Sequence, residues 1–169
     1  MARLIFLTHP EVVIDPATPV PRWPLSTVGR WRMGRFAEHC AGLALAAVYS
    51  SDERKALDGA EIVARRLGAP HHIDAALGEN DRSSTGYVAP PRFWEIVEAF
   101  FAHPEESVLG WETARAAQAR ITGAVRRANA AAPPDQDLVI VSHGGVGRLL
   151  AAALMNVPIG QEIRPQHSG

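Results

Sequence analysis

The sequence predicts an α/β fold, specifically a three-layer α/β/α sandwich on a mainly parallel sheet. Short apolar segments typical of buried strands alternate with longer segments whose apolar residues recur every three or four positions. The 169 residues are 47% hydrophobic and 21% charged, as in ordinary globular proteins. A chain of this length buries one sizeable core without metals or disulfides, so we expect a single domain over residues 1–169.

The first half of the chain predicts three strands and two helices. Leu4 to Thr8 is a run of large apolar residues, as in a strand buried on both faces. Ser26 is suited to cap a helix that ends near Cys40, and the apolar segment Ala44 to Tyr49 follows as the second strand. Asp52 to Leu67 has helical spacing and ends before a glycine. His71 to Ile73 is a short third strand.

The second half continues the alternation of helices and strands. Helices are expected at Arg92 to Ala102 and at Trp111 to Asn129, where alanines, Ile and Val recur on one face. Leu138 to Val141 is the clearest strand of the chain, and a Gly-Gly turn leads from it into a helix at Val146 to Met155. The segment Asn156 to Gly169 predicts a loop and a polar tail.

Two long loops connect these elements. Pro10 to Pro24 holds five of the 13 prolines, which excludes a regular helix. Leu77 to Pro91 contains Gly, Pro, Asn, Asp and Ser without a period, which predicts an excursion over the sheet. Ordered loops of this length often serve a functional site.

The charge balance argues against several kinds of partner. Lys and Arg number 17 against 18 Asp and Glu, so no strongly basic face for nucleic acid or an acidic membrane is expected. The longest uncharged apolar stretch, Ala41 to Tyr49, is too short to span a bilayer. The single Cys40 forms no internal disulfide and no Cys-x-x-Cys zinc pair, so a cytoplasmic location fits best.

Candidate catalytic groups follow the strands. His9 and His143 come directly after two of them, and ligands of open α/β sheets bind at the carboxyl ends of the strands. Gly144 and Gly145 let the backbone approach a ligand closely, and the first amides of the helix that follows can bind an anion. Ser51 and Lys55 add a hydroxyl and a cation at a third strand end. Together they predict a pocket for a transferred phosphate, with one imidazole as nucleophile.

Three segments in this order resemble the histidine phosphatase superfamily, which has the phosphoglycerate mutase-like fold. They are LIFLTHPE at Leu4 to Glu11, VYSS at Val48 to Ser51, and VIVSHGGV at Val139 to Val146. The resemblance implies that His9 is the phosphorylated histidine and His143 the second histidine of the phosphate pocket. It also implies that Glu79 is the proton donor.

The chain departs from the family pattern at its cationic positions. Thr8 stands where the family has the arginine before its nucleophile, and Lys55 where it has a second pocket arginine, unless a one-residue slip lets Arg54 serve. Thr8, Ser51, Gly144 and either cation are therefore the expected phosphate contacts. Lys and Thr lack the planar fork of Arg, and losing one such anchor weakens transition-state binding by about 3 kcal/mol.

These observations predict a cofactor-independent and metal-independent phosphatase for a small phosphomonoester. The alternative is a catalytically weakened or inactive pocket that binds a phosphorylated ligand or a protein partner. A metal site made by both histidines and Glu79 is a rival use of the same residues. Glu11 and Glu112 are alternative proton donors. Because the chain ends early for this family, an edge strand is expected to be missing, which would leave an edge open for a homodimer.

Overall fold

The structure is a computed structural model that describes residues 2–160. Its centre is a four-stranded sheet in the order β1-β4-β2-β3, in which every neighbouring pair is parallel. The connections between parallel strands are helical, as this topology requires. The strands are β1 (Leu4–Thr8), β2 (Leu45–Ser50), β3 (His71–Ile73) and β4 (Asp137–Ser142).

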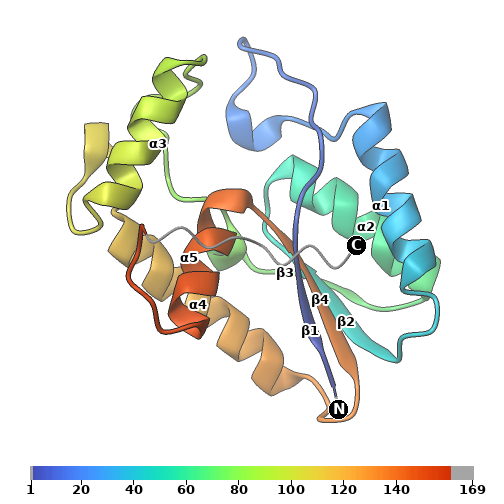
Figure 1. Cartoon of the computed structure of the whole chain (residues 1–169). Helices are drawn as coiled ribbons and strands as arrows, with labels where there is room; N and C mark the ends of the chain where they lie inside the picture. Colours follow the sequence, from blue (N-terminus) through green and yellow to red (C-terminus); the bar gives the residue numbers. More distant parts are fainter. Residues whose placement is uncertain (1, 161–169) are drawn as a thin grey trace.

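Helices cover both faces of the sheet, which gives three layers (Figure 1). One layer contains α1 (Thr27–His39) and α2 (Arg54–Leu67). The opposite layer contains α4 (Ala114–Ala131) and α5 (Gly144–Leu154), and α3 (Arg92–Ala102) lies at its outer end. The predicted α/β/α sandwich with a parallel sheet is therefore confirmed.

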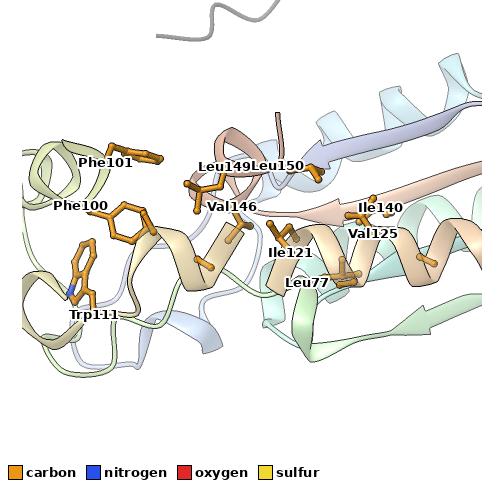
Figure 2. Close-up of a cluster of buried hydrophobic side chains, with 14 of the residues drawn as sticks. Leu77, Phe100, Phe101, Trp111, Ile121, Val125, Ile140, Val146, Leu149 and Leu150 are labelled. Atoms are coloured by element: carbon orange, nitrogen blue, oxygen red, sulfur yellow. The ribbon is translucent and has the colours of Figure 1, made fainter. Parts of the chain in front are cut away.

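Two apolar cores lie on either side of the sheet. The core on the α4 and α5 side runs from Ile140 of the sheet to an aromatic group of Phe100, Phe101 and Trp111 at the end near α3 (Figure 2). The core on the other side joins α1 and α2 to Val139 and other side chains of the opposite sheet face. Alternate residues of β4 thus enter different cores, which fixes its register.

The elements lie close to their predicted positions, with three shifts at helix starts. α4 begins at Ala114, because Thr113 caps it and Trp111 is buried among the aromatic side chains. α5 begins directly after His143, two residues before the predicted start. The N-cap position of α2 is Glu53, which makes no capping hydrogen bond with its side chain, and not one of the serines or Asp52. The third strand and α3 have the predicted bounds.

β1 and β3 form the two edges of the described sheet. The predicted polar tail lies largely in residues 161–169, outside the described residues, so the missing edge strand and the homodimer stay predictions. Within the described part of the chain, no helix has the length and apolar character needed to cross a membrane.

Candidate active site

The register of the sheet brings the predicted site residues together. Thr8 of β1 pairs with Ser142 of β4, so the next residues, His9 and His143, emerge side by side at the carboxyl edge. Their ring centroids are 5.2 Å apart and the rings meet edge to face at 68°. Ser51 follows β2, the other neighbour of β4, and its hydroxyl reaches His143 Nε2 at 2.7 Å.

His9 is held in one tautomer. Its Nδ1 lies 2.9 Å from the Pro10 carbonyl oxygen. Since a carbonyl only accepts, Nδ1 carries the proton and the lone pair of neutral His9 is on Nε2. Burial lowers the pKa of His9 below its ordinary value, with a smaller contribution from Lys55, although the Pro10 carbonyl works in the opposite direction. His9 is therefore a neutral imidazole at pH 7, the form that a nucleophile requires.

His143 is fully buried. Besides the Ser51 hydroxyl, its Nε2 lies 3.3 Å from a carboxylate oxygen of Glu53. Burial lowers the pKa of His143 to about 4, despite the nearby carboxylates of Glu53 and Glu79. His143 is thus also neutral at pH 7.

Protonation of His143 is expected to destabilise the fold in acid. Because its pKa falls from 6.5 to about 4 on folding, the unfolded chain binds the proton more readily between these values. The stabilisation is complete above pH 6.5 and is lost as the pH falls through 4, by up to about 3 kcal/mol. Urea unfolding from pH 7 to 4 should therefore show a steeper loss of stability in the wild type than in His143→Gln. Equal slopes would contradict this assignment.

Lys55 is buried beside the histidines, but its charge is already paired. Its ammonium group donates to the Val20 carbonyl at 2.9 Å and to the Glu53 carboxylate. Burial opposes the charged form of Glu53, but its pKa lies below the ordinary value because of His143, which is protonated only in acid, the positive charge of Lys55, and hydrogen bonds from Lys55 and the Glu79 amide. The pocket therefore contains a Glu53–Lys55 ion pair rather than an isolated cation.

Arg54 does not take the role of a pocket cation. Its guanidinium pairs with Asp58, one turn further along α2. Asp58 is fully buried, accepts a hydrogen bond from the Leu25 amide at 3.0 Å and forms an ion pair with Arg30 at 2.8 Å. Asp58 thus links Leu25 and Arg30 to α2, and Arg54 pairs with this buried carboxylate rather than with the two histidines.

Glu79 lies across the start of α5. Its Oε2 accepts from the Gly145 amide at 2.9 Å, and its Oε1 accepts from the Val146 amide at 3.0 Å. A Cβ on Gly145 would lie 2.6 Å from Oε1, so glycine permits this approach. Two of the amides that were expected to bind an anion therefore donate to Glu79. The amide of Gly144, the first residue of α5, has no acceptor within the helix and can still bind a phosphate oxygen.

The remaining predicted residues lie elsewhere or at the margin. Thr8 is exposed at the end of β1. Glu11 accepts from the Ser26 hydroxyl at 2.7 Å, and Glu112 pairs with Arg120, so both alternative proton donors have structural partners. Within residues 2–160, no group of three or more His, Cys, Asp or Glu side chains is placed to hold a metal ion.

Two residues of this site were missed by the sequence analysis. Glu53 contacts Lys55 and His143 and also accepts from the Glu79 amide at 3.0 Å. Arg82 lies 3.5 Å from Glu79 Oε2. Glu53 has the signal of a carboxylate two residues before a pocket lysine, and Arg82 that of a cation three residues after the proposed proton donor. Neither spacing is specific by itself.

The chain is similar to a known protein family and to several solved structures. A family model described as the histidine phosphatase superfamily (branch 1) matches residues 19–168. Among solved structures, the chain is similar to mycobacterial hydrolase 2, with 25% identity over 94% of this chain and 74% of that one and a TM-score of 0.80. YhfR of Bacillus stearothermophilus has 25% identity over 93% of this chain and 81% of its own, with a TM-score of 0.75.

A mycobacterial glucosyl-3-phosphoglycerate phosphatase, Rv2419c, in complex with inorganic phosphate is also similar. The identity is 26% over 95% of this chain and 82% of that one, with a TM-score of 0.76. No curated protein sequence matches the chain. The family match begins after His9, and the fold then places His9 beside His143. Because the family model matches most of the sequence and the solved relatives share the fold, the chain belongs to the histidine phosphatase superfamily.

Proposed function

We propose that this protein is a phosphatase that hydrolyses a small phosphomonoester through a phosphohistidine at His9. The observation that carries the proposal is the hydrogen bond between His9 Nδ1 and the Pro10 carbonyl, which leaves an unprotonated Nε2 beside His143. A neutral imidazole with a fixed lone pair is the form that attacks phosphorus. Family membership and the phosphatase among the solved relatives support the same reaction class.

In the first step, His9 Nε2 attacks phosphorus in line with the ester oxygen. The P–N bond forms as the P–O ester bond breaks, and Glu79 supplies the proton to the leaving alkoxide. The Ser51 hydroxyl and the Gly144 amide are donors for the equatorial oxygens, and the Lys55 ammonium group has one N–H beyond the two that bond Val20 and Glu53. The products of this step are the free alcohol and phospho-His9.

In the second step, water attacks the phosphohistidine. Glu79, now a carboxylate, accepts a proton from the water as the new P–O bond forms and the P–N bond breaks. Inorganic phosphate leaves and His9 returns to its neutral form. Neither step requires a metal ion or an organic cofactor, and a small phosphorylated substrate is the only partner that the reaction needs. A cytoplasmic location suits such a substrate and the unpaired Cys40.

The proposal is tested by hydrolysis of 4-nitrophenyl phosphate with and without EDTA. We expect turnover that survives the chelator and is inhibited by vanadate, which imitates the transition state of phosphoryl transfer. Activity that stops in EDTA and returns with a divalent cation would contradict metal independence. Absence of turnover on both aryl and alkyl phosphates would contradict the proposed activity.

One observation favours a second candidate, a pocket that binds a phosphorylated ligand or a protein partner without turnover. Lys55 is paired with Glu53, and Thr8 offers a neutral hydroxyl, so neither position presents a guanidinium fork. This candidate predicts that calorimetry detects binding of inorganic phosphate or a phosphoester by a protein that hydrolyses none. It also predicts that Glu79→Gln leaves this binding unchanged.

A further inference from the structure

Arg82 presents a fixed guanidinium at the rim of the candidate site. Its guanidinium carbon lies 4.8 Å from the ring centroid of Trp111 and 5.3 Å from that of Phe93. Trp111 is itself buried and anchored by a hydrogen bond of 2.9 Å from its indole to Thr85. Aromatic faces of this kind hold a planar cation in one orientation.

Asn80 fixes the guanidinium further. Its Oδ1 accepts from both Nε and Nη2 of Arg82, at 2.9 and 2.8 Å. Since guanidinium nitrogens only donate, the amide oxygen must face Arg82. The amide nitrogen of Asn80 is consequently buried without a hydrogen-bond partner in the described part of the chain. An unsatisfied buried donor is unfavourable, so holding Arg82 takes precedence over satisfying Asn80.

One edge of the guanidinium remains available. Nε and Nη2 are turned toward Asn80 and Glu79, whereas Nη1 has no hydrogen-bond or ion-pair partner among residues 2–160. The side chain as a whole is 24% exposed, so part of it is open to solvent. A guanidinium that is fixed by its neighbours and has free N–H groups is suited to bind a carboxylate or phosphate.

The partners of Glu79 place Arg82 on the side of the leaving group. Glu79 Oε1 accepts hydrogen bonds from the amides of Val146 and Asn80. Its Oε2 accepts from the Gly145 amide and also contacts Arg82 Nη2. Arg82 contributes the longest of these contacts, 3.5 Å. If Arg82 engages a substrate anion instead, Oε2 has room for the proton that Glu79 passes to the leaving oxygen.

We infer that Arg82 is a specificity-determining residue that binds a second anionic group, a carboxylate carried by the alcohol part of the phosphomonoester. The inference rests on the proposed function and names its substrate class. Glu79 gives its proton to the ester oxygen, and Arg82 lies directly beside Glu79. The carboxylate of the substrate must therefore lie within a few bonds of the ester oxygen. Phosphoglycolate has this arrangement, and ethyl phosphate has the same short chain without the carboxylate.

The test compares these two probes on the wild type, Arg82→Met and Arg82→Lys. We expect kcat/KM of the wild type to favour phosphoglycolate, and Arg82→Met to lower this preference by about tenfold to a hundredfold. Arg82→Lys should be intermediate, because it keeps the charge but loses the fork. Arg148→Met is the matched control, since Arg148 also stacks on an aromatic ring, at 4.2 Å from Phe101, but is not next to Glu79.

Binding of both probes is also measured by calorimetry, so that the inference is separable from turnover. In one outcome the wild type hydrolyses neither probe but binds phosphoglycolate more tightly than ethyl phosphate, and Arg82→Met loses this preference. That result would overturn the proposed function and support the assignment of Arg82. Equal preference in the wild type and in well-folded Arg82→Lys and Arg82→Met would overturn the Arg82 assignment. Thermal melting of each variant identifies any loss of fold.

Discussion

His9→Ala is expected to lower the turnover of phosphomonoesters by about a thousandfold or more, because it removes the atom that attacks phosphorus. Water in the emptied space cannot form the covalent intermediate, and the neighbouring His143 is buried and already hydrogen-bonded to Ser51. The loss should appear in kcat for aryl and alkyl phosphates alike. Steady-state kinetics on both substrate types measure it.

His103→Ala provides the matched control. The side chain of His103 is 57% exposed and lies at the end of α3, away from the paired histidines. We expect this variant to keep wild-type kcat, and both variants to keep the wild-type melting behaviour within a few degrees. A folded His9→Ala protein with turnover close to that of the wild type would rule out His9 as the nucleophile.

Glu79→Gln is expected to have the second largest effect, a loss in kcat of about a hundredfold on alkyl phosphates. Glutamine is similar in size but cannot give up a proton to the leaving alkoxide. The loss should be much smaller on 4-nitrophenyl phosphate, since nitrophenolate leaves without protonation. The ratio of the two losses therefore separates proton donation from a general disturbance of the site.

Glu11→Gln is the control for this substitution, because Glu11 contacts Ser26 and not the start of α5. It should leave both substrates unaffected. Glutamine at position 79 also presents an NH₂ group to one of the two helix amides, so thermal melting is recorded alongside. Equal losses on both substrates would argue against Glu79 as the proton donor.

The strand and helix pattern could be predicted from the sequence because each element has a local signal. The apolar runs of β1 and β4 and the periodic faces of α2 and α4 are independent of distant contacts. The start of α4 was less predictable, since Trp111 has an apolar side chain in phase with the helix but is buried in the aromatic group. Only the tertiary packing distinguishes these two uses of a tryptophan.

The site was partly predictable for a related reason. His9, Ser51 and His143 follow strands directly, so the parallel sheet places them at one edge once the strand order is known. Glu53 and Arg82 act through contacts between segments far apart in the sequence. The Glu53 carboxylate reaches His143, and the Arg82 guanidinium lies against Trp111. Such pairings follow from the packing of loops, for which the sequence has no periodic signal.

The phosphohistidine at His9, on which the proposed mechanism depends most, can be trapped directly. The protein is mixed with excess phosphoglycolate or 4-nitrophenyl phosphate, quenched at alkaline pH and digested with trypsin for mass spectrometry. We expect one added phosphoryl group on the peptide Leu4 to Arg22, whose only histidine is His9, and none in His9→Asn. Steady turnover with this peptide unmodified, or with the phosphoryl group on another residue, would contradict the mechanism.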